Sequence, residues 1–138
     1  MKMTGGCLCG AVRFEAEDVP EEIGVCHCGQ CRRWASGPWF AARGNDVRFT
    51  GAESLGRYAS SEWAERGFCK RCGTSLFYHM HDEPYYMLAV GAFDDQSRFR
   101  LARQVFIEEK PAFYDFAQET QNSSGDDFFV GRAQRTGR

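Results

Sequence analysis

The sequence predicts a mainly β protein made of short strands. Short runs of alternating apolar and polar residues recur between residues 11 and 108, which is typical of half-buried strands. The 15 glycines fall mostly between these runs, where tight turns are expected. No long stretch repeats apolar residues at helical spacing. The fold class is therefore mainly β with few short helices.

The expected strands are bounded by Gly, Asn, Asp or Ser. In the first of them, Val12 and Phe14 face one side, while Arg13 and Glu15 face the other. A helical turn is predicted after a cysteine cluster, and another after Pro111. The predicted strands cover residues 11–16, 39–43, 47–50, 67–69, 75–79, 85–90 and 104–108, and the predicted helical turns cover 30–34 and 112–118.

The length of 138 residues fits a single domain with a modest core, to which 12 phenylalanines contribute. Because such a core is small, a metal or a disulfide would add useful stability. We predict one domain over residues 1–118, since no linker or repeat interrupts it. Residues 119–138 are rich in Gln, Asn, Ser, Gly, Asp and Arg, which predicts a frayed polar tail. Its apolar island at 128–130 leaves a docking strand or partner contact as the alternative.

The charge balance excludes some classes of partner. A net charge of −2 and a pI near 5.9 argue against a general binder of nucleic acids or anionic membranes, which would carry a basic excess. No apolar stretch approaches the length needed to span a bilayer. The first six residues lead directly into a cysteine motif, so we expect no signal peptide and a cytoplasmic location. In that reducing compartment, cysteines usually serve metal binding or catalysis.

Seven cysteines form three groups, and an odd count fits a set of disulfides poorly. The number divides naturally into four plus three. A structural zinc site takes four thiolates, whereas a catalytic zinc site keeps three protein ligands and one open position. The groups are Cys7-Leu8-Cys9, Cys26-His27-Cys28-Gly29-Gln30-Cys31 and Cys69-Lys70-Arg71-Cys72.

A glycine follows Cys9 and another follows Cys72. In a zinc knuckle such a glycine lets the backbone turn sharply, so that amide N–H groups point at the thiolate sulfurs. This shared feature predicts one closed structural zinc site that joins distant parts of the chain. The alternatives are buried thiols without metal and an iron–sulfur cluster. The predicted ligands are Cys7, Cys9, Cys69 and Cys72.

The remaining Cys26, Cys28 and Cys31 lie close enough in sequence to bind a second metal ion, and we predict that they form the catalytic site. Three thiolates on Zn²⁺ carry a net charge of −1, which makes a weak Lewis acid but leaves a position for a substrate thiolate. Arg32 and Arg33 would offset the negative charge and bind carboxylates of an anionic ligand. An equally weighted interpretation makes these arginines ordinary surface charge.

Other interpretations of the middle group stay open. A histidine would close the site as a fourth ligand, or the three thiols would form a redox trio without tightly bound metal. For the histidine between two cysteines, we expect a side chain that points to solvent. The large aromatic residues near this group would wall a pocket or, as preferred, belong to the core or an interface. The candidate ligands are His27, His79 and His81, and the aromatic residues are Trp34, Trp39 and Phe40.

Three segments together resemble the glutathione-dependent formaldehyde-activating enzyme family, also called the centromere protein V family. They are GCLCGAVRF at 6–14, CHCGQCRR at 26–33 and FCKRCGTSL at 68–76, and the order and spacing of all seven cysteines agree with the family pattern. The segment VGAFD at 90–94 is similar to a later strand of the family that ends in Gly-x-x-Asp. The resemblance covers roughly residues 3–110.

The resemblance implies an Mss4-like fold of several small, coiled antiparallel sheets around zinc. It implies a structural zinc on the first and last cysteine pairs and a second zinc on the middle three, where glutathione binds with its sulfur near the metal. The implied activity is condensation of formaldehyde with glutathione to S-hydroxymethylglutathione, which is classed with carbon–sulfur lyases. The implied partners are a small thiol and an aldehyde.

Two classes of function remain open at this point. The first is a small thiol-dependent zinc enzyme, which the vacant position of a three-cysteine site favours. The alternative is a non-catalytic binding module in which both zinc ions are structural. An exposed edge strand in so small a β domain would also allow pairing with a second copy as a homodimer.

Overall fold

The structure is a computed structural model that describes residues 2–128, and the chain divides into two compact units. The first unit comprises Met1–Glu21 and Ala41–Phe99, and the second comprises Glu22–Phe40 and Arg100–Arg138. Strands dominate both units, while the helices are short. The predicted fold class, mainly β with few short helices, is confirmed.

The first unit is an antiparallel assembly in which each strand pairs with a neighbour. β1 pairs with β2, and β2 pairs with the second half of β4. The first half of β4 pairs with β8, followed in order by β7, β6 and β5. The bounds are β1 Met3–Gly6, β2 Arg13–Glu17, β4 Trp39–Thr50, β5 Leu55–Ala59, β6 Ala64–Cys69, β7 Ser75–Met80 and β8 Tyr86–Ala89, with 3-10 turns η1 at Ala52–Ser54 and η2 at Val90–Ala92.

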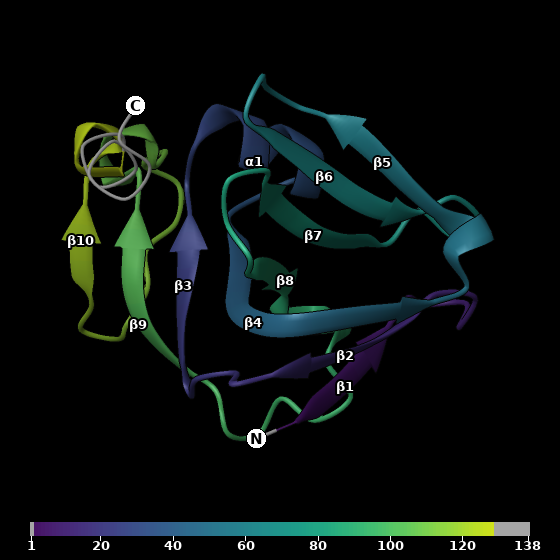
Figure 1. Ribbon diagram of the computed structural model, residues 1–138. Coiled ribbons are helices and arrows are strands. Elements are labelled where there is room, and N and C mark those ends of the chain that lie inside the picture. The colour runs from purple at the N-terminus through teal and green to yellow at the C-terminus, as the bar shows by residue number, and fades with distance from the viewer. Residues whose placement is uncertain (1, 129–138) are drawn as a thin grey trace. The chain divides into compact units, whose positions relative to one another are not determined.

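The long strand β4 bends and thereby connects two sheets of the first unit (Figure 1). Residues 41–44 pair with β8, whereas residues 45–50 pair with β2. Asp46 has a φ of 50°, a left-handed conformation, and lies between Asn45 and Arg48, where the register of pairing with β2 shifts. The sequence predicted two separate strands here. The structure keeps a single strand, because backbone pairing continues through the polar residues between the two apolar runs.

The core of the first unit consists of side chains that alternate along its strands. Val12 and Phe14 are buried, while Arg13 between them is exposed, as the alternation predicted. The ring of Phe14 meets that of Phe93 edge to face at 5.2 Å. Leu76 and Leu88 are also fully buried. Each such side chain contributes about 1.5–3 kcal/mol through burial, so these strands carry most of the unit's stability.

The second unit contains three strands that run side by side in the same direction (Figure 1). β9 (Arg100–Val105) lies between β3 (Glu22–Cys26) and β10 (Gln121–Ser123), and both pairings are parallel. The family resemblance implied antiparallel sheets, and these two pairings differ from it. Parallel pairing arises here because a long connection, and no hairpin turn, separates β3 from β9. The helix α1 (Gly29–Ala35) and the 3-10 turn η3 (Ile107–Glu109) complete the unit.

The two helical turns predicted from the sequence have different outcomes. The predicted helical turn at 30–34 is confirmed as part of α1. The predicted helical turn at 112–118 is wrong, because these residues form turns and extended chain. Their alternation places the rings of Tyr114 and Phe116 against His27, at 5.5 and 6.0 Å, which a helix would not allow.

The segment after Glu119 has more structure than the predicted polar tail. Residues 121–123 form β10 and pair with β9, and the ring of Phe128 lies 5.6 Å from that of Phe106. The other two residues of the apolar island, 129 and 130, lie outside the described residues. The sequence also did not predict β1, β3 or β5, which are short and have weak apolar alternation.

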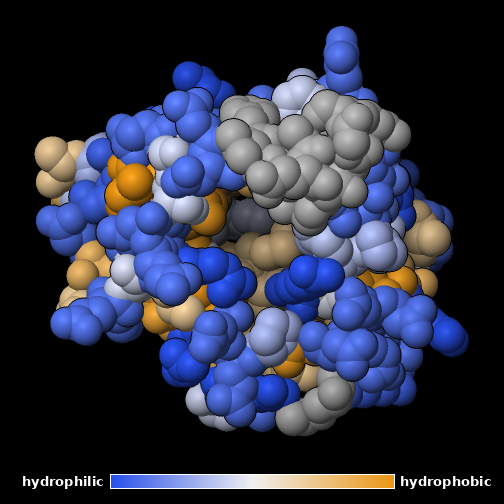
Figure 2. Space-filling view, turned by 60° about the vertical axis from the view of Figure 1, so that its left-hand side comes forward, coloured by the Kyte–Doolittle hydropathy of each residue, from blue (hydrophilic) through white to orange (hydrophobic). Residues whose placement is uncertain are grey.

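The visible molecular surface is mainly hydrophilic, and its hydrophobic residues are scattered in small groups (Figure 2). Three large hydrophobic side chains within residues 2–128 are well exposed, namely Leu8, Tyr58 and Phe113. No helix among these residues is long and apolar enough to cross a membrane.

A substitution at Gly67 tests how closely β6, the strand that ends at Cys69, packs against β7. A Cβ atom at this position would lie 2.0 Å from the ring of Phe77, its partner on β7. Gly67→Ala should therefore lower the free energy of unfolding by about 1–3 kcal/mol, measured by urea denaturation. Gly91→Ala is the control, since its Cβ would have no neighbour within 4 Å. Equal midpoints for both variants would contradict this packing.

Candidate metal centres

The first candidate centre lies within the first unit and gathers all four predicted structural ligands. The sulfur atoms of Cys7, Cys9, Cys69 and Cys72 lie within 4.8 Å of one another. The Cys7–Cys9 and Cys9–Cys69 sulfur pairs are 3.7 and 3.8 Å apart. Four thiolates at the usual Zn–S distance of about 2.3 Å form a tetrahedron with edges of about 3.8 Å. The donor set and the spacing therefore both fit zinc.

Two similar turns present these cysteines. Gly10 and Gly73 have φ values of 81° and 80°, and a Cβ at either position would have no neighbour within 4 Å. The glycines are thus required by backbone conformation and not by lack of space. The N–H of Gly10 donates to the carbonyl of Cys7, and that of Gly73 donates to the carbonyl of Cys69. The sharp turns expected from the sequence are present at both positions.

Backbone N–H groups surround the sulfur atoms of this cluster. Val12 donates to the sulfur of Cys7 at 3.3 Å, and Arg71 donates to that of Cys69 at 3.4 Å. The hydroxyl of Thr74 lies 3.1 Å from the sulfur of Cys72. Such contacts stabilise thiolate charge and orient the ligands of a metal.

The pKa values of the cluster show how strongly the thiols interact. The Thr74 hydroxyl and its backbone N–H lower the pKa of Cys72 to about 5. The backbone N–H of Ala11 lowers the pKa of Cys9, but burial and the neighbouring thiols outweigh it and raise that pKa to about 11. One thiol therefore ionises readily while another resists ionisation. A divalent cation removes this conflict, because it stabilises all the thiolates together.

The second candidate centre lies within the second unit and gathers the other three cysteines. The sulfur atoms of Cys26, Cys28 and Cys31 lie within 4.8 Å of one another. Cys26 ends β3, Cys28 caps the N-terminus of α1, and Cys31 is buried in the first turn of that helix. The N–H of Cys31 donates to the sulfur of Cys28 at 3.3 Å. A strand end and a helix start thus converge on one point.

These three thiols also interact unfavourably when they ionise without a cation. The thiols of Cys28 and Cys31, followed by burial, raise the pKa of Cys26 well above its ordinary value. A metal ion in the cluster would reverse this effect. Three thiolates with no fourth protein ligand are the donor set that leaves one coordination position open.

Within residues 2–128, no histidine joins either cysteine cluster. His27 was expected to point to solvent, and this expectation is wrong because its side chain is 0% exposed. Its Nδ1 lies 2.7 Å from the hydroxyl of Tyr114, and its Nε2 lies 2.7 Å from Oε1 of Gln104. Both ring nitrogens are therefore engaged, and neither is available to a metal.

The other two histidines belong to the first unit. Nε2 of His79 is 2.9 Å from the carbonyl of Glu83, and its ring stacks on Tyr86 at 3.9 Å. His81 is exposed, and its backbone N–H donates to the carbonyl of Trp63. These contacts give both histidines structural partners in the β7–β8 region.

The predicted arginines differ in their surroundings. Arg32 is half-buried, and its Nε donates to the carbonyl of His27 at 2.9 Å. Its two terminal nitrogens make no hydrogen bond or ion pair within the described part of the chain. Arg33 is exposed. Arg32 is thus tied to the loop that carries the cysteines, while Arg33 lies in solvent.

The aromatic residues near the second centre pack against one another, as the preferred interpretation predicted. The rings of Trp34 and Trp39 are 5.3 Å apart, and Phe40 meets Phe116 edge to face at 5.5 Å. Trp39 is buried, whereas Trp34 and Phe40 are half-buried. They form the packed surroundings of α1 within the second unit.

Sequence reasoning missed three residues around His27, namely Gln104, Tyr114 and Thr120. The Nε2 group of Gln104 donates to the hydroxyl of Thr120 at 2.9 Å. Burial lowers the pKa of His27 and raises that of Tyr114, so both side chains are neutral near pH 7. Only the alternation of Tyr114 and Phe116 offered a signal, because it indicates extended chain that presents both rings on one side.

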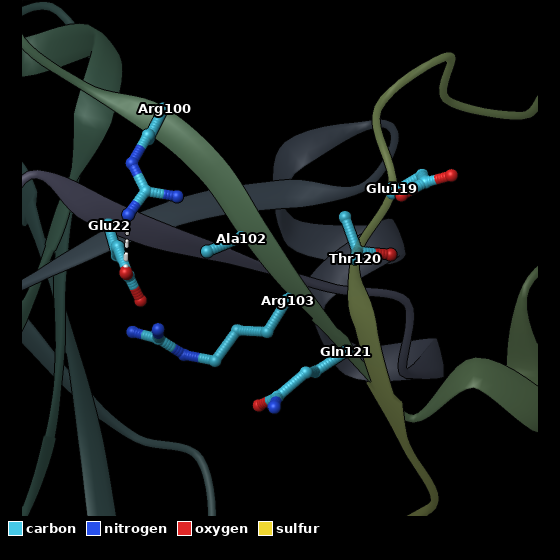
Figure 3. Close-up of a pocket in the computed structure, with 7 residues that line it drawn as sticks. All are labelled: Glu22, Arg100, Ala102, Arg103, Glu119, Thr120 and Gln121. Carbon is cyan, nitrogen blue, oxygen red and sulfur yellow. Dashed lines mark hydrogen bonds and ion pairs between the residues drawn. The ribbon is translucent and has the colours of Figure 1, made fainter.

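A separate polar pocket of about 340 Å³ lies beside the three parallel strands (Figure 3). The guanidinium of Arg100 forms an ion pair with Glu22 at 2.5 Å. None of the seven cysteines lines this pocket, so it is distinct from both candidate centres. Its lining residues are Glu22, Arg100, Ala102, Arg103, Glu119, Thr120 and Gln121.

Comparisons with known proteins agree with this arrangement. The family model described as "Glutathione-dependent formaldehyde-activating enzyme" matches residues 2–109. An uncharacterized lyase of Schizosaccharomyces pombe is 36% identical over 118 residues, which cover 84% of this chain and 86% of the yeast protein. A Halomonas elongata protein, provisionally named a glutathione-dependent formaldehyde-activating enzyme, is 32% identical over 87 residues, which cover 56% of this chain and 55% of that protein.

A solved structure is also similar. The crystal structure of a Rhodobacter sphaeroides protein from structural genomics matches with a TM-score of 0.55 and 31% identity, covering 67% of this chain and 88% of that one. The names of the relatives support an enzyme. The family model covers most of the chain and includes all seven cysteines, and the clustering of these cysteines fits two metal sites. The chain therefore belongs to the glutathione-dependent formaldehyde-activating enzyme family.

Proposed function

We propose that the protein binds glutathione at a zinc ion held by Cys26, Cys28 and Cys31, and catalyses its reversible addition to formaldehyde. The observation that carries this proposal is the three-sulfur cluster without a fourth protein ligand among residues 2–128. A site that serves only as a scaffold has no need of a vacant position, whereas a substrate thiol needs one. Family membership and the names of the relatives support glutathione and formaldehyde as the reactants.

The four-cysteine cluster has a different role in this proposal. Its four sulfur atoms are the complete ligand set that a tetrahedral zinc site requires, and backbone N–H groups of two turns donate to them. The cluster connects the loop before β2 with the β6–β7 turn, about 60 residues further along the chain. It would hold a zinc ion that stabilises the first unit and takes no part in the reaction.

The reaction conserves atoms and electrons without a redox partner. The glutathione sulfur forms a bond with the formaldehyde carbon, the carbonyl π bond opens, and the thiol proton ends on the new hydroxyl oxygen. Bound zinc would lower the pKa of a coordinated thiol, so that the thiolate is present near pH 7. The reverse reaction breaks the same carbon–sulfur bond, in agreement with a lyase of the S-(hydroxymethyl)glutathione synthase type.

The chain's own residues would mainly bind and orient the thiol. Arg32 is the candidate for a glutathione carboxylate, because its Nε is fixed by the carbonyl of His27 while its terminal nitrogens remain available. Arg33 is exposed and would act more weakly, through charge alone. The two arginines also offset the surplus negative charge of the three thiolates.

Zinc content should separate the two clusters. We expect two zinc ions per wild-type chain and one in Cys28→Ser, measured by elemental analysis. Serine preserves the N-cap of α1, so this variant should stay folded. Cys72→Ser should also lose one zinc, but its melting temperature should fall by about 10 °C or more, because a structural metal contributes directly to folding. Equal melting temperatures for the two variants would contradict the division into structural and catalytic sites.

Glutathione binding should depend on the second cluster and on Arg32. Calorimetry should show binding to the wild type, no binding to Cys28→Ser, and about 10-fold weaker binding to Arg32→Gln, because a charge-assisted hydrogen bond is lost. Arg33→Gln is the matched control and should change the affinity much less. Two zinc ions with no response to any thiol would favour the alternative, a binding module with two structural metals.

The reaction itself can be followed by NMR with ¹³C-formaldehyde and glutathione. We expect the wild type to accelerate exchange between free and adduct carbon at least about 10-fold, since bound reactants meet in a fixed orientation. Cys28→Ser should match the uncatalysed rate. A wild-type rate equal to that of buffer would exclude formaldehyde as the substrate, whatever the zinc content.

A further inference from the structure

His27 stands between two ligands of the three-cysteine cluster, and all four of its hydrogen-bonding groups are engaged. Its backbone N–H donates to the carbonyl of Val105 at 3.2 Å, and its own carbonyl accepts from Nε of Arg32 at 2.9 Å. Its ring nitrogens meet Tyr114 and Gln104, both at 2.7 Å. Because His27 is fixed at four points, its covalent neighbours Cys26 and Cys28 are fixed as well.

The direction of each hydrogen bond in this network follows from the hydrogen bond between Thr120 and Asn122. The hydroxyl of Thr120 donates to Oδ1 of Asn122 at 2.7 Å, so it accepts from Nε2 of Gln104. Oε1 of Gln104 must then face His27 and accept from its Nε2–H. Nδ1 of His27 is therefore the acceptor, and the hydroxyl of Tyr114 is its donor.

This series of hydrogen bonds connects His27, between Cys26 and Cys28, with β10 of the second unit. It runs from Tyr114 through His27, Gln104 and Thr120 to Asn122 of β10, and each donor points the same way. Its central members are buried, since His27 is 0% exposed and Gln104 is 7% exposed. A buried network of this kind holds its geometry firmly, because an unsatisfied member costs more than an exposed one.

We infer that Tyr114 and Gln104 are positioning residues for the three-cysteine metal site, and that they act through His27. Neither residue makes a hydrogen bond to a cysteine sulfur within residues 2–128. They hold the imidazole from both sides, and this sets the directions of the sulfurs of Cys26 and Cys28. The inference rests on the proposed function in one respect, which is that the three cysteines bind a metal ion.

The consequence is a metal affinity that depends on residues remote in sequence. Partners that orient metal ligands typically contribute 10- to 100-fold to metal affinity or activity. Tyr114→Phe keeps the ring that packs on His27 and removes only the hydroxyl. Gln104→Met keeps the approximate volume and removes both polar groups. Each variant should weaken zinc binding at the three-cysteine site by about 10-fold.

A double-mutant cycle distinguishes positioning through His27 from two independent losses. If both residues act through one imidazole, the double variant should be only about 10- to 20-fold weaker than the wild type, and not the about 100-fold expected for independent effects. Transfer of zinc from the protein to a chromophoric chelator measures the affinity of each site for zinc. The wild type should release zinc in two phases, and the phase that is missing in Cys28→Ser belongs to the three-cysteine site.

Matched controls make the same chemical changes away from the network. Tyr58→Phe removes an exposed hydroxyl in the first unit, and Gln121→Met changes an exposed side chain on β10. Both should leave the two zinc phases unchanged. The positioning variants should change one phase only, whereas a general loss of folding would weaken both. If Gln104→Met does not fold, Thr120→Val replaces it, because it removes the group that orients the Gln104 amide.

The outcomes separate this inference from the proposed function. A wild type that binds one zinc per chain would contradict the proposed function and the inference together. Two zinc ions with unchanged affinity in Tyr114→Phe and Gln104→Met would overturn the inference alone. Effects that multiply to about 100-fold in the double variant would also overturn it, because the two residues would then act separately.

Discussion

Crowding of thiolates is the physical constraint on which both halves of this structure depend. Seven sulfur atoms lie in two clusters, each with its sulfurs within 4.8 Å of one another. The neighbouring thiols and burial raise the pKa of Cys26 and of Cys9, so the thiols of neither cluster are all ionised near pH 7 without a cation. A divalent metal turns the repulsion between thiolates into attraction. In the first cluster the same ion would also cross-link segments about 60 residues apart in the sequence.

The groups that support the cysteines differ between the two clusters. Around the first, the supporting groups are mostly backbone N–H groups of tight turns, which two glycines make possible. Around the second, a strand end and a short helix supply the ligands, and a chain of buried side chains holds the loop between them. Backbone support is rigid and local. Side-chain support extends over more of its unit, so the geometry of the second cluster depends on residues far from it in the sequence.

Local sequence made the grouping of the cysteines predictable, whereas the residues that support the second cluster come from distant parts of the chain. The spacing of the cysteines and the glycines after Cys9 and Cys72 was sufficient to assign the cysteines to two clusters, because each turn is encoded within a few residues. Gln104 and Tyr114 are 77 and 87 positions from His27. Gln104 reaches it because β9 pairs in parallel with β3, and such a pairing has no hairpin turn to mark it in the sequence. Tyr114 lies on the segment that follows β9 and η3. Pro111 suggested a helix where the chain instead extends to present Tyr114.

In the proposed function, Arg32 would connect the recognition of substrate with the position of the three cysteine sulfurs. Its Nε is held by the carbonyl of His27, the residue whose neighbours supply two of the three sulfurs. A carboxylate bound by its terminal nitrogens would therefore sit at a fixed separation from the open metal position. Selection among thiols would then follow from the distance between sulfur and carboxylate, and not from charge alone. A thiol without that carboxylate would still reach the metal but would lose its orientation. The reaction rate should therefore fall more than the affinity of the thiol for the site.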